Sequence, residues 1–154
     1  MRFIFELNHP KHYYQFKYIM SILEERGHSI MVLARDKDVL LRVLQEEGVP
    51  YNVFGIHKES ISGKVFSSFS ILRHYKRIAK EFSPDVIVSK ASLYGTLVAK
   101  MLGCKSFIFP DSEVVKLTNR VVAPLATRIV TPEPFTIDFG EKHIRINGVF
   151  EDYD

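Results

Sequence analysis

The stretch Arg2–His12, RFIFELNHPKH, decides the fold class. Its strand-like part carries Phe3, Ile4, Phe5 and Leu7, a nearly continuous apolar run that is typical of a strand buried on both faces. The next five residues, NHPKH, are polar and contain a stiff proline, and an amphipathic segment follows them. A buried strand that leads through a short polar loop into a helix favours a parallel sheet covered by helices, so we expect this strand to lie centrally.

The rest of the chain repeats this alternation of strands and helices. Further strands are predicted over 28–34, 50–54, 86–89, 105–109 and 127–130, and helices over 13–26, 36–47, 65–82, 92–102 and 113–126. Two short segments, 135–139 and 143–146, could add an antiparallel edge. Residues 55–64, GIHKESISGK, lack periodicity and are interpreted as a mobile loop. The pattern predicts a doubly wound, Rossmann-like α/β domain with a mostly parallel sheet of six or seven strands.

Composition narrows the class of protein. The chain has 154 residues, enough for one domain, and its net charge of +3 is spread along the sequence, which does not imply a nucleic-acid partner. The longest apolar run, Ile30–Ala34, is far too short to span a bilayer, and the start lacks a signal-peptide core. We therefore expect a cytoplasmic protein without a transmembrane segment. The single cysteine, Cys104, is interpreted as a small buried hydrophobe.

Candidate binding residues follow the predicted strands. In an open parallel sheet, ligands bind outside the carboxyl ends of the strands, near the point where the strand order reverses. Polar segments stand at these ends after the first, fourth, fifth and sixth strands. From the first three of them we select as binding residues His9, Pro10, Lys11, Ser89, Lys90, Ser92, Asp111, Ser112 and Glu113, and as a candidate acid or base His12.

The residue types in these segments indicate their chemistry. The first loop contains no glycine, which argues against NAD or FAD, and no phosphate-loop motif occurs. Histidine is the residue type whose unperturbed pKa lies near neutral pH, so His9 and His12 suit general acid or base catalysis; the alternative is that they only cap the helix or bond their own loop. The serines have the same alternative, capping alone, while Lys90 offers a cation for a phosphate. We assign no metal and no cofactor, because no metal-ligand spacing is present.

Four motifs, in this order, resemble the DUF354 family: Pro-x-His at Pro10 and His12, RGH at Arg26–His28, SPD at Ser83–Asp85, and D-S-E at Asp111–Glu113. The resemblance covers about residues 1–151. The family's loop reads Asn-Pro-Pro-His, so His12 corresponds directly. The family is in turn similar to the GT-B class of glycosyltransferases and to UDP-GlcNAc 2-epimerases.

This resemblance implies two Rossmann-like domains that face each other. Residues 1–146 would be the N-terminal, acceptor-side domain of a GT-B fold, and residues 147–154 the start of the crossover to a missing C-terminal domain. The implied function is acceptor binding in a glycosyltransferase that uses a nucleotide-sugar donor, with His12 as general base and with no activity in this half alone. The second half would come from further chain or a separate partner, and an exposed apolar face could instead drive a homodimer.

Two other functions stay open. The same scaffold could be half of a UDP-sugar 2-epimerase or hydrolase, which releases or isomerises sugar without an acceptor. It could also be a non-catalytic sugar-binding or assembly module, in which the strand-end residues only bind and residues 55–64 contact a partner. Whether the chain is part of an enzyme is therefore left open by the sequence.

Overall fold

A computed structural model describes residues 1–55, 61–110, 121–132 and 140–146 of the chain. In this part, seven strands form one sheet in the order β3-β2-β1-β4-β5-β6-β7, and every adjacent pair is parallel. The strands are β1 (Arg2–Leu7), β2 (Ser29–Arg35), β3 (Asn52–Phe54), β4 (Val86–Ser89), β5 (Lys105–Ile108), β6 (Arg128–Pro132) and β7 (His143–Ile146). The predicted doubly wound α/β fold is confirmed.

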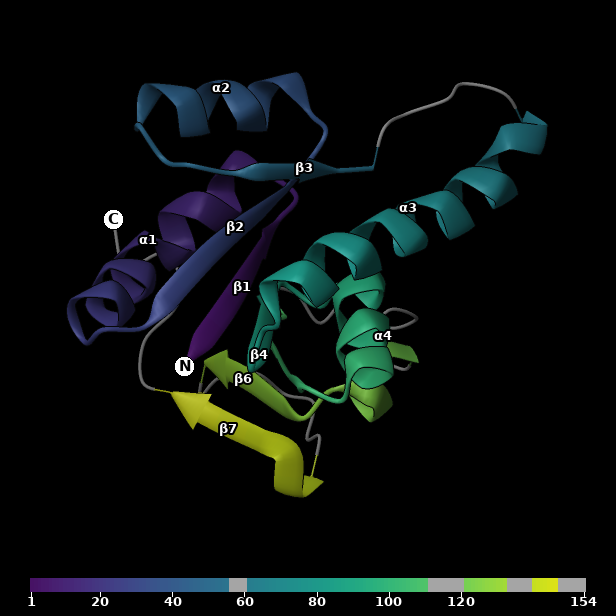
Figure 1. Cartoon of the computed structure of the whole chain (residues 1–154). Coiled ribbons are helices and arrows are strands. Elements are labelled where there is room, and N and C mark those ends of the chain that lie inside the picture. Colours follow the sequence, from purple (N-terminus) through teal and green to yellow (C-terminus); the bar gives the residue numbers. More distant parts are fainter. Residues whose placement is uncertain (56–60, 111–120, 133–139, 147–154) are drawn as a thin grey trace.

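Four helices connect these strands in the described part of the chain (Figure 1). They are α1 (Pro10–Glu25), α2 (Asp38–Glu46), α3 (Ile61–Phe82) and α4 (Leu93–Leu102), and single 3₁₀ turns cover Ala123–Leu125 and Gly140–Lys142. The first two helices pack on one face of the sheet and the other two on the opposite face. This arrangement gives the three layers that the alternating pattern predicts.

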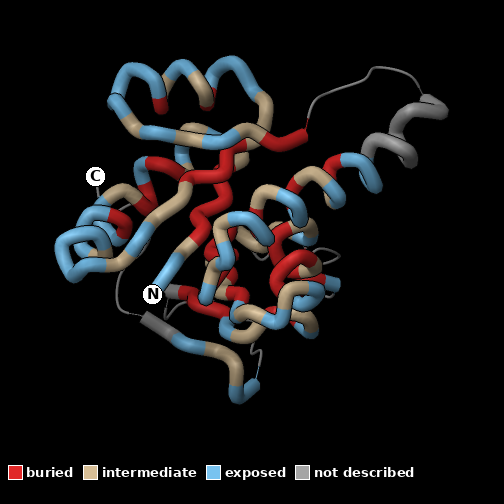
Figure 2. Tube along the Cα trace, in the orientation of Figure 1, coloured by how far each residue is buried: buried red, intermediate tan, exposed pale blue. Residues whose placement is uncertain are grey.

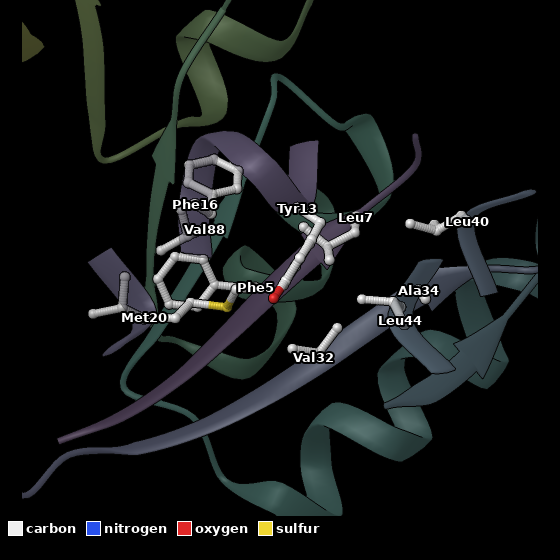
Figure 3. Packing of buried hydrophobic residues seen from close by; sticks show 11 residues of the cluster. Phe5, Leu7, Tyr13, Phe16, Met20, Val32, Ala34, Leu40, Leu44 and Val88 are labelled. Carbon is white, nitrogen blue, oxygen red and sulfur yellow. The ribbon is translucent and has the colours of Figure 1, made fainter. Parts of the chain in front are cut away.

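Strand β1 lies between β2 and β4, as its apolar run predicts. Phe5 and Leu7 belong to the core under α1 and α2, where Phe16 and Leu44 also pack (Figure 3). Ile4 points to the other face, into the core under α3 and α4. Burial is therefore continuous along β1, and Figure 2 shows the buried residues gathered in the strands at the centre of the molecule. The strand order reverses between β1 and β4, so the predicted binding edge lies where these two strands end.

Three predicted helix starts are wrong, and several other element ends differ by one or two residues. Helix α1 begins at Pro10 rather than at residue 13, because His9 caps it and Pro10 starts its first turn. Helix α2 begins at Asp38 rather than at residue 36, and the Asp36 amide donates to the carbonyl of Phe54 on β3. Residues 61–64, predicted as loop, are the first turn of α3.

One further prediction is wrong. Strand β7 runs parallel to β6, not antiparallel, with Ile129 opposite His143. On α4, Met101 is 47% exposed, because the sheet-facing side of the helix is taken by Val98 and Ala99. The predictions for 56–60, 113–120, 135–139 and 147–154 lie outside the described residues.

Candidate functional site

The loop after β1 begins α1 with a histidine cap. His9 has an extended backbone, and its Nδ1 accepts a hydrogen bond from the Lys11 amide at 3.1 Å. Pro10 occupies the first helical turn, where it has no amide hydrogen to leave unsatisfied. The structure therefore gives His9 the capping role that the sequence analysis kept as its alternative, with the ring and Lys11 both exposed at the helix start.

His12 is the third residue of α1, three residues after the His9 cap. Its Nδ1 accepts a hydrogen bond from the Asn8 backbone amide at 3.1 Å, and its own amide donates to the His9 carbonyl at 3.0 Å. A neutral imidazole that accepts at Nδ1 carries its proton on Nε2. The contact with Asn8 therefore fixes both the orientation of the half-buried ring and its tautomer, and presents Nε2–H as a hydrogen-bond donor.

The loop after β4 is built by its two serines. Ser89 is buried, and its Oγ accepts from the Ser92 amide at 3.2 Å. Ser92 caps α4, with its Oγ accepting from the Gly95 amide at 3.3 Å. Between them Ala91 has a φ of 65°, in the left-handed region that costs a residue with a Cβ about 1–2 kcal/mol. Both serines are thus used by their own loop, which holds a strained backbone in place.

Lys90 connects this loop to the first one. Its ammonium is buried and lies 5.7 Å from the centre of the Phe16 ring on α1. Phe16 is one helical turn after His12, so both residues share one side of α1. The neighbouring strand ends therefore bring the His12 ring and the Lys90 cation to the same edge of the sheet. Asp111, Ser112 and Glu113, the third part of the predicted site, lie outside the described residues.

Glu6 is a site residue that the sequence analysis did not select. It is fully buried near the carboxyl end of β1, and its Oε2 accepts a hydrogen bond from the Asn8 side-chain amide at 2.6 Å. Burial raises the pKa of this carboxyl, although the neighbouring groups of Ser92, Asn8, Tyr75 and Arg35 lower it in part. Burial and the adjacent Glu6 likewise raise the pKa of Tyr75 well above its ordinary value. The two buried groups therefore both favour their neutral forms.

Gly95 makes room for this pair. A Cβ on Gly95 would lie 2.7 Å from Glu6 Oε1 and 3.0 Å from the Tyr75 hydroxyl oxygen. The two oxygens thus lie side by side under the first turn of α4, although within the described part of the chain neither meets hydrogen-bond geometry. One signal could have revealed the cluster: Glu6 is an acid inside a run that is otherwise apolar on both faces.

Two other features of the described residues bear on the class of protein. No group of three or more His, Cys, Asp or Glu side chains gathers where it could hold a metal ion. Within the same residues, no helix is long and apolar enough to cross a membrane. An open hollow of about 460 Å³ lies against α3 and Met101, on the face of the sheet opposite α1 and His12.

The fold has clear relatives among solved structures. They include MurG from Acinetobacter baumannii, at 18% identity, a TM-score of 0.76 and coverage of 96% of this chain and 45% of MurG. UDP-GlcNAc 2-epimerase from Neisseria meningitidis bound to UDP-GlcNAc has 11% identity, a TM-score of 0.76 and coverage of 99% of this chain and 48% of the epimerase. Spinosyn rhamnosyltransferase SpnG complexed with thymidine diphosphate has 15% identity, a TM-score of 0.62 and coverage of 86% of this chain and 45% of SpnG.

The architecture is therefore that of one half of a GT-B glycosyltransferase-like or 2-epimerase-like protein, and the chain spans less than half the length of these relatives. Residues 3–148 match the family described as "Protein of unknown function (DUF354)". The chain belongs to this family, as the four motifs predict. No curated protein sequence matches it.

Proposed function

We propose that this chain is the acceptor-binding half of a glycosyltransferase that uses a nucleotide-sugar donor. The observation that carries the proposal is the placement of an anchored histidine and a buried lysine at the strand ends where the order of the sheet reverses. The GT-B-like architecture supports it, and SpnG and the Neisseria epimerase are nucleotide-bound examples of that architecture. The donor-binding half would be supplied by further chain or by a separate partner.

In this proposal the loops at 8–12 and 89–92, together with Asp111–Glu113, form the acceptor pocket. His12 acts on the reacting oxygen, and Lys90 offers positive charge to a phosphate. The hydrogen bond from Asn8 makes His12 Nε2 a donor in the resting state. To serve as general base through Nε2, the ring has to change tautomer and give up that hydrogen bond.

Substitution of His12 tests the assignment in the full-length protein. For His12→Ala we expect kcat/KM for sugar transfer to fall about 10²- to 10⁴-fold, the usual contribution of a positioned acid or base. His12→Gln is the matched variant, because its amide can donate a hydrogen bond but cannot accept a proton at neutral pH. Retained activity in His12→Gln assigns the donor role, and loss in both variants assigns the base role. Unchanged kcat/KM in His12→Ala would remove His12 from the mechanism.

Half of a UDP-sugar 2-epimerase or hydrolase is the second candidate. It is favoured by the Neisseria epimerase, which matches 99% of this chain with a TM-score of 0.76. Product analysis with a UDP-sugar separates the two: transfer requires an added acceptor, whereas epimerisation or hydrolysis proceeds without one. If calorimetry detects no nucleotide-sugar binding to the full-length protein, the non-catalytic binding module becomes the better description.

A further inference from the structure

We propose that Glu6 is the positioning residue of this site, and that its buried carboxyl holds Asn8, which in turn holds the His12 ring. The proposal rests on the proposed function in one respect, namely that His12 is the acting group. Glu6 itself does not reach a substrate, because it is fully buried below the loop.

The hydrogen bonds that join Glu6, Asn8 and His12, here called the relay, cross the sheet at the end of β1. Glu6 and Asn8 are two residues apart, and the Asn8 side chain donates to Glu6 Oε2 on the face that carries α3 and α4. The backbone amide of the same Asn8 donates to His12 Nδ1 on the α1 side. One residue thus bonds to both faces, and its position is set by the Glu6 carboxyl beneath it.

The surroundings of Glu6 hold the carboxyl itself in one place. Tyr75 from α3 and Gly95 from α4 lie against Oε1, and the Ser92 hydroxyl at the start of α4 also faces the carboxyl. The guanidinium of Arg35 on β2 contributes charge from the edge, between the rings of Phe54 and Tyr94. Glu6 therefore links α3, the first turn of α4 and the loop after β1, so it couples both loops of the proposed pocket.

The geometry of the carboxyl suits this role, because its Oε2 accepts from Asn8 and its Oε1 lies near the Tyr75 oxygen. Glutamine has the same shape, keeps an acceptor oxygen for Asn8 and carries an amide group in place of the second oxygen. Leucine fills the volume but makes no hydrogen bond, so it suits an apolar strand and breaks the relay. The pair Glu6→Gln and Glu6→Leu therefore separates positioning from packing.

The test reads the His12 ring directly. With ¹⁵N-labelled histidine, NMR reports the tautomer of each ring in the whole chain. We expect wild type and Glu6→Gln to show His12 protonated on Nε2, and Glu6→Leu to show a mixture of the two tautomers. In the full-length protein, Glu6→Leu should lower kcat/KM about 10- to 100-fold through misplacement of the ring, and Glu6→Gln should restore it.

Ile4→Val is the matched control, since Ile4 is equally buried on the same face of β1 and belongs to the apolar core there. It should destabilise the fold slightly and leave the His12 tautomer unchanged. Should Glu6→Leu fail to fold, Asn8→Ala cuts the same relay outside the core and should give the same tautomer mixture. A wild-type His12 tautomer in both cut variants would overturn the proposal.

The experiment distinguishes failure of the positioning role of Glu6 from failure of the proposed function. If the full-length protein binds no nucleotide sugar while Glu6→Leu still shifts the His12 tautomer, the positioning stands and the glycosyltransferase proposal fails. If transfer depends on His12 but is unchanged in Glu6→Leu, the positioning role is wrong and the glycosyltransferase proposal stands.

Discussion

The polar groups at the two ends of the central strands β1 and β4 differ in their burial. At the amino end, exposed groups pair directly. The Met1 amine contacts His28 Nδ1 at 2.9 Å. The backbone amide of Arg2 donates to Asp85 Oδ2 at 2.8 Å, and its side-chain Nε donates to the Phe82 carbonyl at 2.7 Å. At the carboxyl end, the polar side chains of Glu6 and Ser89 are buried.

From this difference we infer that the polar groups at the amino end serve stability, whereas those at the carboxyl end serve function. Exposed pairs lose little hydration when they form, and they hold the strand ends together. Buried polar groups reduce the stability of the fold, because folding takes them out of water. A positive φ at a residue with a Cβ occurs at both ends, at Ser83 (55°) before β4 and at Ala91 (65°) after it, so the buried carboxyl of Glu6 is the feature that distinguishes the carboxyl end. A fold keeps such unfavourable features chiefly where they position reacting or binding groups. The predictions below test this division in order of expected effect.

The largest effect should come from filling the space beside Glu6. Gly95→Ala places a Cβ 2.7 Å from Glu6 Oε1 and 3.0 Å from the Tyr75 oxygen, so we expect a loss of about 2–3 kcal/mol in the free energy of unfolding, measured by urea denaturation. Gly27→Ala, at the amino end of β2, meets nothing within 4 Å and has a φ of 86°, so its cost should be about 1 kcal/mol of backbone strain. Equal losses would mean that the Glu6 pocket can expand freely.

A second effect should appear in the pH dependence of stability. Because the pKa of Glu6 is raised in the folded state, the native protein binds more protons than the unfolded chain as the pH rises above the ordinary value of about 4.5. The free energy of unfolding should therefore fall with rising pH, by at most about 1.4 kcal/mol per pH unit from this group.

Glu6→Gln removes that titration. Its Tm relative to wild type should increase as the pH is raised from 4.5 toward neutrality, although Asn8, Arg35, Tyr75 and Ser92 still face the side chain. Glu46→Gln, on the exposed side of α2, serves as the control and should keep a constant difference. A Tm difference that shrinks with rising pH would show that Glu6 is ionised in the folded protein.

The smallest effect should be at the amino end. Asp85→Ala removes the acceptor for the Arg2 amide, and we expect a loss of about 1 kcal/mol, with the His12 tautomer and nucleotide-sugar binding unchanged. Asp85→Asn keeps an acceptor oxygen and should recover most of the loss. A change in binding for Asp85→Ala would contradict the division between the two ends.

Strong periodic patterns made most of the fold predictable. The bounds of β1 and β4 are confirmed to the residue, because a mostly apolar run is flanked by turn-forming or polar residues in both. The start of α1 was missed because a histidine is an unusual N-cap. The start of α2 was missed by two residues, and at the predicted start the Asp36 amide donates to the Phe54 carbonyl on β3, a tertiary contact that no local pattern reveals.

The candidate site was predictable only in part. Strand ends and residue types located His12 and Lys90, which the fold brings to one edge. The tautomer of His12 depends on the Asn8 amide, and the burial of Glu6 depends on Tyr75 of α3 and Gly95 of α4, more than 60 residues away in sequence. Such features arise from tertiary packing, so spacing along the chain does not contain them.

The central place of β1 has a consequence for biosynthesis. This strand is made before both of its partners and pairs with β2 early, but its other partner, β4, follows about 50 residues after β2. At ribosomal rates of about 5–20 residues per second, one edge of an apolar strand stays open for about 3–10 seconds. Aggregation competes with folding in that interval, so slower translation between residues 36 and 85 should lower the yield of folded protein, and a chaperone that covers the β1 edge should restore it.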